Sequence, residues 1–184
     1  ISQDFGQYEG QGDSKGLQMR KWDHGNLDIV SDITSIPEPD YSFDAIMCTE
    51  VLEHIPDTLA AIREFSRLLR PGGYLLITAP FCSLTHFSPY HFSTGFSRYF
   101  FEHHLPKNGF EILEIASNGN YFEYIAQEII RIQEIAKRYA GRSLNIFELF
   151  VLFLNLRMLQ GYSVRDKGSD ELLCFGYHIF ARKL

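Results

Sequence analysis

Short apolar runs alternate with helix-like spacing over residues 1–118, and this alternation predicts an α/β domain. Gly, Gln and charged residues dominate 6–25, which predicts a loop. The run at 43–48 ends in a continuously apolar stretch, as is typical of a parallel strand buried on both faces. The expected strands in this part of the chain are 1–5, 27–30, 43–48, 74–79 and 110–115.

One helix is expected between two signals that mark its ends. Asp57 is a residue type that caps helix N-termini, and apolar residues near helical spacing continue from it to about residue 69. Pro71, Gly72 and Gly73 follow, and they would stop the helix before the next strand.

From about residue 119 the pattern becomes helical. The expected elements are an amphipathic helix at 121–139, a helix at 144–159 that is apolar on most sides, a polar loop at 161–170 and a last strand at 172–181. We therefore expect an α/β domain formed by 1–118 and 161–184, with 119–160 as a helical insert.

Length and composition narrow the function classes. The 184 residues suit roughly one domain, and 45% hydrophobic residues exclude a chain without a core. The net charge of −6 shows no basic excess and disfavours a nucleic-acid-binding domain. Cys48, Cys82 and Cys174 have neither disulfide-framework nor zinc-site spacing, which favours a reducing, cytoplasmic setting. The longest apolar stretch, 146–159, is shorter than the roughly 20 residues that span a bilayer.

Three segments carry a resemblance to a known family. They are FDAIMCTEVLEHI at 43–55, RLLRPGGYLLI at 67–77 and NGFEI at 108–112. In this order and spacing they resemble the fourth strand with its loop, the turn into the fifth strand and the entry to the sixth strand of class I S-adenosylmethionine-dependent methyltransferases (methyltransferase type 11-like). The resemblance implies a Rossmann-like class I methyltransferase sheet, S-adenosyl-L-methionine as cofactor and an enzyme of the EC 2.1.1 class.

The resemblance also implies which residues would hold the cofactor. Asp4 would end the family's second strand and accept hydrogen bonds from both ribose hydroxyls. Asp32 and Ile33 would contact the adenine after the third strand. The alternatives are a solvated loop aspartate at Asp4 and an ordinary turn aspartate at Asp32. Three residues after the fourth strand complete the predicted cofactor-binding set. The set is Asp4, Phe5, Asp32, Ile33, Glu50, Val51 and His54.

The residues after the fourth strand have roles of two kinds. Glu50 and Val51 would line the methionine arm of the cofactor. His54 ends the same motif, and a packing role that holds the loop is at least as good an interpretation as a role in the chemistry.

The family's glycine-rich turn after the first strand is not present in these 184 residues. The pair Gly10 and Gly12 does not replace it, since no apolar strand leads into it. The family's first strand lies between its second and fourth, so its loss would leave two sheet edges unpaired. Because residue 1 is Ile rather than Met, we expect an N-terminally truncated sequence with this strand upstream.

The segment after the fifth strand, 80–92, is rich in aromatic and histidine side chains, which suits a small-molecule pocket. His86 and His91 are the candidate general bases, and Phe81, Tyr90 and Phe92 are the candidate substrate-pocket residues. The alternative is a packed lid whose histidines only bond to the backbone. We expect no metal, because no carboxylate or cysteine lies at a diagnostic spacing from these histidines.

The leading functional hypothesis is methyl transfer to a small-molecule or carrier-linked acceptor. A non-catalytic methyltransferase-like domain that acts as a scaffold or partner-binding module is the alternative, and a nicotinamide-dependent oxidoreductase fits the 49–54 loop poorly. The aromatic insert at 119–160 would serve as a cap over the acceptor or as a homodimer interface. A membrane contact is disfavoured, because Arg157 is the one cation of the apolar helix.

Overall fold

In the computed structural model, residues 1–6, 16–17 and 25–184 are described. They form two compact units, Ile1–Ala116 with Gly176–Leu184 and Ser117–Phe175. The second unit contains the 119–160 segment predicted as a helical insert and extends beyond it at both ends. Most of the loop predicted at 6–25, with the glycine pair at 10–12, lies outside the described residues.

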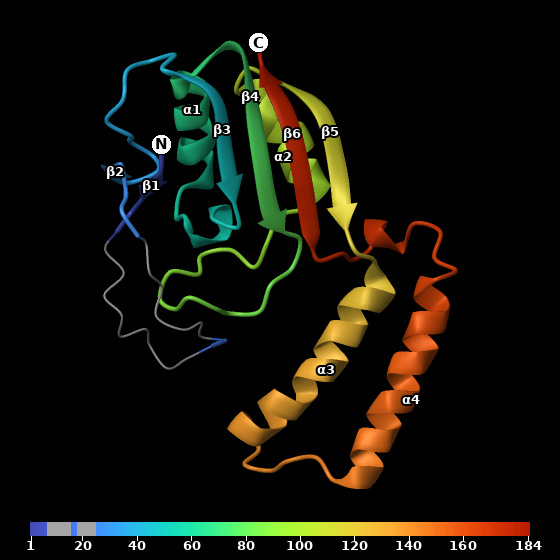
Figure 1. The fold of residues 1–184 in the computed structure, drawn as a ribbon. Coiled ribbons are helices and arrows are strands. Elements are labelled where there is room, and N and C mark those ends of the chain that lie inside the picture. The colour runs from blue at the N-terminus through green and yellow to red at the C-terminus, as the bar shows by residue number, and fades with distance from the viewer. Residues whose placement is uncertain (7–15, 18–24) are drawn as a thin grey trace. The chain divides into compact units, whose positions relative to one another are not determined.

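A four-stranded sheet with the order β3-β4-β6-β5 forms the first unit (Figure 1). β4 is parallel to β3 and antiparallel to β6, and β5 runs in the direction of β4 in Figure 1. A separate parallel pair joins the two short strands β1 and β2. The strands are β1 (Gln3–Asp4), β2 (Ile29–Val30), β3 (Phe43–Thr49), β4 (Leu69–Pro80), β5 (Phe110–Asn118) and β6 (Gly176–Lys183). This is an α/β, Rossmann-like sheet with one antiparallel strand, as the resemblance implied.

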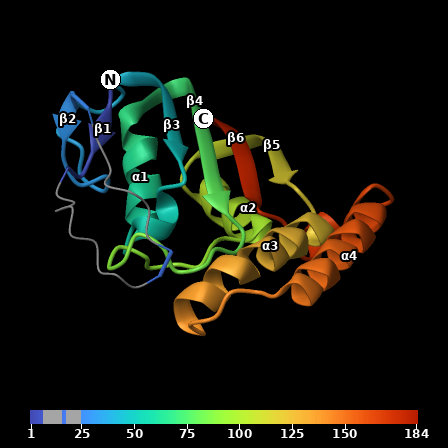
Figure 2. The ribbon, with the colours of Figure 1, turned by 60° about the horizontal axis from the view of Figure 1, so that its bottom comes forward.

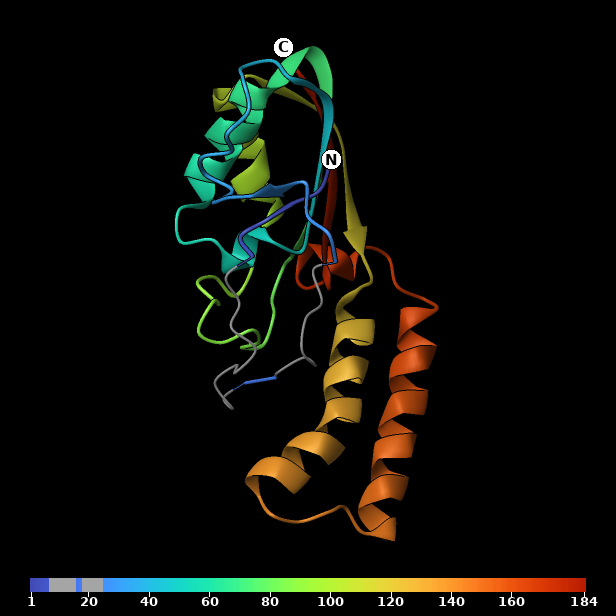
Figure 3. The same cartoon turned by 60° about the vertical axis from the view of Figure 1, so that its left-hand side comes forward.

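The core lies on one face of this sheet. Leu75, Ile77 and Ala79 of β4 are fully buried and alternate with more exposed residues, as the period of a strand requires. Two helices, α1 (Thr58–Leu68) and α2 (Arg98–Lys107), lie on the same side of the sheet (Figure 3). On the opposite face the Tyr74 and Phe180 rings stack with centres 5.3 Å apart and stay partly exposed.

Helix α1 begins as predicted, but β4 begins earlier than predicted. The Asp57 carboxylate accepts a hydrogen bond from the Ala60 N–H at 2.9 Å, which makes Asp57 the N-cap. β4 starts at Leu69, directly after the helix, and Phe43 pairs with Leu69 while Ala45 pairs with Tyr74. The extra residues of β4, 70–73, are therefore accommodated as a bulge rather than as a loop before the strand.

The prediction that β3 is buried on both faces is wrong for most of its residues. Cys48 is buried, whereas Met47 is 72% exposed. Among the described strands β3 pairs with β4 alone, so one edge of β3 has no neighbour there. The apolar pattern identified the strand correctly but not its environment.

The second unit is built on two helices that pack against each other, α3 (Tyr121–Tyr139) and α4 (Ile146–Ser163). Asn120 caps α3, and Asn145 with Glu148 forms a capping box at the start of α4. The Phe122 and Tyr162 rings stack between the two helices, with centres 5.5 Å apart. A short 3-10 helix, η2 (Ser169–Glu171), follows.

Helix α4 continues past Gly161 to Ser163, where a loop was predicted, because a single glycine weakens a helix without ending it. Three phenylalanines of α4 are more than half exposed: Phe147, Phe150 and Phe153. No helix among the described residues has the length and apolar character needed to cross a membrane. The roles of cap and homodimer interface remain predictions.

Candidate functional site

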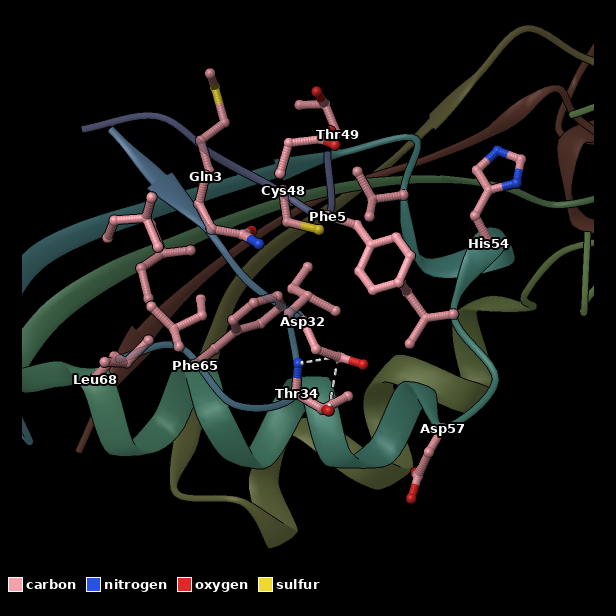
Figure 4. Close-up of a pocket in the computed structure, with 18 of the residues that line it drawn as sticks. Gln3, Phe5, Asp32, Thr34, Cys48, Thr49, His54, Asp57, Phe65 and Leu68 are labelled. Carbon is pink, nitrogen blue, oxygen red and sulfur yellow. Dashed lines mark hydrogen bonds between the residues drawn. The ribbon is translucent and has the colours of Figure 1, made fainter. Parts of the chain in front are cut away.

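A cavity of about 560 Å³ lies in the first unit, along the open edge of β3 from Phe43 to Thr49 and between that edge, α1 and the β1 and β2 segments. The arrowheads of β3 and β4 point to the same end of the sheet, and the 81–96 loop starts there (Figure 2). The side chains of Phe5, Asp32, Cys48 and His54 surround this space (Figure 4). The carboxyl ends of parallel strands are where open α/β sheets bind ligands.

The two predicted cofactor carboxylates both line this cavity. Asp4 is the last residue of β1, and its Oδ1 accepts a hydrogen bond from the Gly6 N–H at 2.8 Å. Asp32 follows β2, and its Oδ1 accepts hydrogen bonds from the Thr34 N–H at 2.8 Å and the Thr34 hydroxyl at 2.7 Å. Asp32 therefore does hold a turn, through one of its two oxygens. Phe5 and Ile33 line the same cavity.

The loop after Asp32 is held on α1 by one arginine. The Arg67 guanidinium donates to both oxygens of Glu64, at 2.7 and 2.8 Å, and also to the Ile36 carbonyl and the Asp40 carboxylate. The Ile36 N–H in turn donates to Glu64 at 2.7 Å. These bonds hold the pKa of the Glu64 carboxyl below its ordinary value. The network fixes the segment that carries Asp32.

The residues after β3 divide between the cavity and the surface. Val51 and His54 line the cavity, as do Cys48 and Thr49. Burial raises the pKa of the Cys48 thiol to about 12, so this thiol is not a nucleophile at neutral pH. Glu50 is exposed and is not among the lining residues. Its φ of 52° lies in the left-handed region, and its N–H donates to the Thr78 carbonyl at 2.9 Å.

The aromatic 81–96 loop is closed by backbone hydrogen bonds at its base and across to η1 (Leu52–His54). The Phe96 N–H donates to the Pro80 carbonyl at 2.8 Å, and the Phe92 and Ser93 N–H groups donate to the Glu53 carbonyl at 2.9 and 3.1 Å. Two of the three predicted substrate-pocket residues, Tyr90 and Phe92, line the cavity.

Phe81, the third predicted substrate-pocket residue, is not among the lining residues. It packs edge-to-face on Tyr177, with ring centres 5.9 Å apart.

His86 and His91, the predicted bases, come together with His54. The His54 and His86 ring centres are 4.8 Å apart, and those of His86 and His91 are 5.0 Å apart. His91 Nε2 lies 3.2 Å from the Ser83 hydroxyl. Burial lowers the pKa of His54 and of His91. Of the three, His54 lines the cavity, and the other two lie behind it.

Sequence reasoning missed Glu53, the residue at the centre of this histidine group. Its side chain is 1% exposed, and Oε1 lies 3.6 Å from His54 Nε2 and 3.9 Å from His86 Nε2. Burial raises the pKa of this carboxyl to about 7. The signal in the sequence was its place directly before His54 in the motif that follows the strand.

Residues 13–77 match the family model described as "Methyltransferase domain". The chain is 57% identical over 37 residues to the ubiquinone biosynthesis O-methyltransferase of Xanthomonas oryzae pv. oryzae (strain PXO99A), which is 20% of this chain and 16% of that protein. It is 41% identical over 56 residues to the 27-O-demethylrifamycin SV methyltransferase of Amycolatopsis mediterranei (strain S699), which is 27% of this chain and 21% of that protein.

The fold is also similar to the crystal structure of the [4+2]-cyclase SpnF. The TM-score is 0.47 at 21% identity, over 84% of this chain and 54% of the other. The chain spans about a fifth or less of the length of the two curated relatives described above. The family-model match over residues 13–77 and these two relatives show that part of this chain is similar to methyltransferases, in agreement with the resemblance to the class I S-adenosylmethionine-dependent family.

Proposed function

We propose that this chain is the part of an S-adenosylmethionine-dependent methyltransferase that contacts the adenosine half of the cofactor and the methyl acceptor. One observation carries the proposal. A cavity along the open edge of β3 has carboxylates from β1 and from the segment after β2 on one side, and an aromatic loop on the other. Both named methyltransferase relatives carry the name of a small-molecule substrate or product, which supports an acceptor of that class.

The residues present fit the adenosine half of the cofactor. A cavity of about 560 Å³ is in the size range of ligand pockets. Asp4, whose Oδ1 also accepts from the Gly6 N–H, is a carboxylate that can accept from the ribose hydroxyls, and Asp32 keeps Oδ2 for the exocyclic amine of adenine while Oδ1 holds its turn. Ile33 and Phe5 supply apolar surface for the base. The glycine-rich turn for the other half is not in this sequence.

The bound cofactor would supply an electrophilic methyl group on a sulfonium leaving group. The task of the protein is then to place the acceptor in line and to exclude water. Tyr90 and Phe92 line the cavity on the acceptor side and suit that task. For a hydroxyl or amine acceptor a base is also required; His86 and His91 are the candidates predicted from the sequence, and neither is among the residues that line the cavity.

The carrier-linked acceptor, the homodimer and the cytoplasmic setting expected from the sequence are also proposals. A carrier-linked acceptor would use the same aromatic wall, and the homodimer would use the exposed phenylalanines of α4. No disulfide joins Cys48, Cys82 and Cys174, which is consistent with the reducing, cytoplasmic setting expected from the sequence. Nothing in the second unit is required for the cofactor contacts proposed above.

Calorimetric titration with S-adenosylhomocysteine tests the proposal. We expect binding, and we expect Asp4→Ala and Asp32→Asn each to weaken it by about 1–3 kcal/mol, or roughly 5- to 150-fold. Asn at position 32 still accepts the two Thr34 hydrogen bonds, so the turn survives while one acceptor oxygen is lost.

Asp44→Ala is the matched control, because Asp44 is exposed and pairs with Arg70 away from the cavity. No binding at high micromolar ligand would refute the proposal. Equal affinity in both site variants would refute the residue assignment.

A further inference from the structure

Three potential metal-ligand atoms converge behind the cavity. Glu53 Oε1, His54 Nε2 and a ring nitrogen of His86 all lie within 4.8 Å of one another. The Glu53 oxygen is 3.6 Å from His54 Nε2 and 3.9 Å from His86 Nε2. The three residues come from two segments, η1 and the 81–96 loop, so chain connectivity alone does not bring His86 to the other two.

The tautomers of the two rings are set by the backbone. His54 Nδ1 lies against the Tyr90 carbonyl, and His86 Nδ1 lies 2.8 Å from the Leu84 carbonyl. A carbonyl only accepts hydrogen bonds, so each Nδ1 carries the hydrogen and each neutral ring presents an Nε2 lone pair. Two lone pairs and a carboxylate then face one point. Such an arrangement repels itself unless the Glu53 carboxyl is protonated or a cation lies between the groups.

The spacing of these atoms suits a shared metal better than direct hydrogen bonds. Separations of 3.6 and 3.9 Å are too long for an N–H···O bond. In a tetrahedral site with metal–ligand bonds of about 2.0–2.2 Å, the ligand atoms are roughly 3.4 Å apart. Small side-chain movements therefore bring the three atoms to bonding distance of one ion.

Glu53 also has an unsatisfied oxygen. Its side chain is 1% exposed, and among the described residues Oε2 has no hydrogen-bond partner. A buried carboxylate oxygen left in this state costs free energy, and a metal that takes one or both oxygens removes the cost. This observation is independent of the convergence of the two histidines.

The surrounding chain holds the cluster in place. The Glu53 carbonyl accepts the Phe92 and Ser93 N–H groups, which ties η1 to the loop. The Leu17 N–H donates to the Thr85 carbonyl at 2.8 Å, next to His86. Metal-bound histidines commonly donate their second ring N–H to a backbone carbonyl, which both His54 and His86 do here.

We infer that Glu53, His54 and His86 form a site for one divalent first-row transition-metal ion, such as Zn²⁺ or Fe²⁺. Two imidazoles and one carboxylate are a ligand set that suits these ions, whereas Mg²⁺ and Ca²⁺ prefer oxygen ligands throughout. Three protein ligands leave at least one coordination position for water or another ligand. The inference does not depend on the proposed function.

Co²⁺ and Zn²⁺ titrations of the full chain test the site. Calorimetry gives the stoichiometry and affinity, and the visible absorption of Co²⁺ reports its coordination. We expect one equivalent bound, a Co²⁺ spectrum typical of low coordination number, and displacement of Co²⁺ by Zn²⁺. His86→Ala and Glu53→Gln should each weaken Zn²⁺ binding at least tenfold. His103→Ala, which removes an exposed histidine of α2, should leave it unchanged.

The inference is overturned if no stoichiometric binding occurs, or if His86→Ala binds Zn²⁺ as tightly as the unchanged protein. Glu53 is buried, so Glu53→Gln is paired with a thermal unfolding scan without metal. His86 lies on a loop with its side chain 25% exposed, so His86→Ala keeps the test decisive even if Glu53→Gln unfolds. Zn²⁺ should raise the unfolding temperature of the unchanged protein and not that of His86→Ala.

Discussion

The Arg67 guanidinium donates hydrogen bonds to both oxygens of the Glu64 carboxylate, with N···O distances of 2.7 and 2.8 Å. The two residues are one helical turn apart on α1, and the Glu64 side chain is 9% exposed. Each partner also bonds to the 36–40 segment, Glu64 through the Ile36 N–H and Arg67 through the Ile36 and Glu38 carbonyls. The pair therefore joins α1 to the loop that follows Asp32.

Replacing Arg67 by lysine should destabilise the protein by about 2–3 kcal/mol. Lysine keeps the charge but cannot make the two-point contact and the additional bonds to carbonyl groups at the same time. Urea unfolding measures the loss. Arg63→Lys is the control, because Arg63 makes a single exposed contact to Asp57 and should change stability by less than about 1 kcal/mol. Equal effects of the two changes would contradict the role given to the network.

The stability of the protein should fall in acid partly through Glu64. The pKa of Glu64 in the folded protein lies below the ordinary value of 4.5, because of its bonds to Arg67. The contribution of ionised Glu64 to the free energy of unfolding is therefore complete when the pH is above that ordinary value. It is lost as the pH falls through the folded-state pKa. The difference in unfolding free energy between the unchanged protein and Glu64→Gln should shrink from about pH 6 to about pH 3. A difference that is constant over this range would show that the charge of Glu64 does not matter.

Substitutions at Glu50 distinguish the cost of its backbone strain from the effect of a contact to the cofactor. Its φ of 52° is costly for any residue with a Cβ and most costly for a β-branched one. Glu50→Val should destabilise by about 1–2 kcal/mol, while Glu50→Gly should be neutral or stabilising by up to about 1 kcal/mol. Thermal unfolding measures both. Glu50→Gln leaves the strain unchanged, so a loss of S-adenosylhomocysteine affinity in that variant without a loss of stability would support the predicted contact to the methionine arm.

Local signals in the sequence predicted α1 and α3 well. The bounds of α3 agree with the expected 121–139, and Asp57 caps α1 as expected. Capping and helical periodicity depend on residues a few positions apart, so a single sequence contains them. The order of strands was available as well, but through the resemblance to a family rather than through the apolar pattern.

Features that depend on distant residues could not be predicted in this way. Met47 has the pattern of a buried strand residue, yet it is 72% exposed, because burial depends on a neighbour that the pattern does not specify. Glu53 looked like one more polar loop residue. Its contact with His86 depends on how the 81–96 loop folds back. The two residues are 33 positions apart, so no local pattern in the sequence indicates the contact. The backbone at Glu50 is left-handed, although Glu50 is neither glycine nor asparagine, the residue types that usually indicate this conformation.

Gly95 and Gly161 should respond in opposite ways to alanine. A Cβ at Gly95 would lie 2.4 Å from the Phe81 carbonyl oxygen, and its φ is 145°, so both the space and the backbone exclude a side chain. Gly161 lies inside α4, and a Cβ added there would have nothing within 4 Å. Gly95→Ala should cost about 2–3 kcal/mol, and Gly161→Ala should stabilise by about 0.5–1 kcal/mol.

Chemical denaturation gives both free energies, and the Gly95 variant has a further expected effect. Gly95 closes the base of the loop that carries Tyr90, His86 and His91, so its displacement should also weaken Zn²⁺ binding. Gly161→Ala provides the matched control, since it changes stability without touching that loop. If Gly95→Ala retains full stability and Zn²⁺ affinity, the loop does not depend on the close approach of Gly95 to Phe81, and the position of His86 must be fixed by its other contacts.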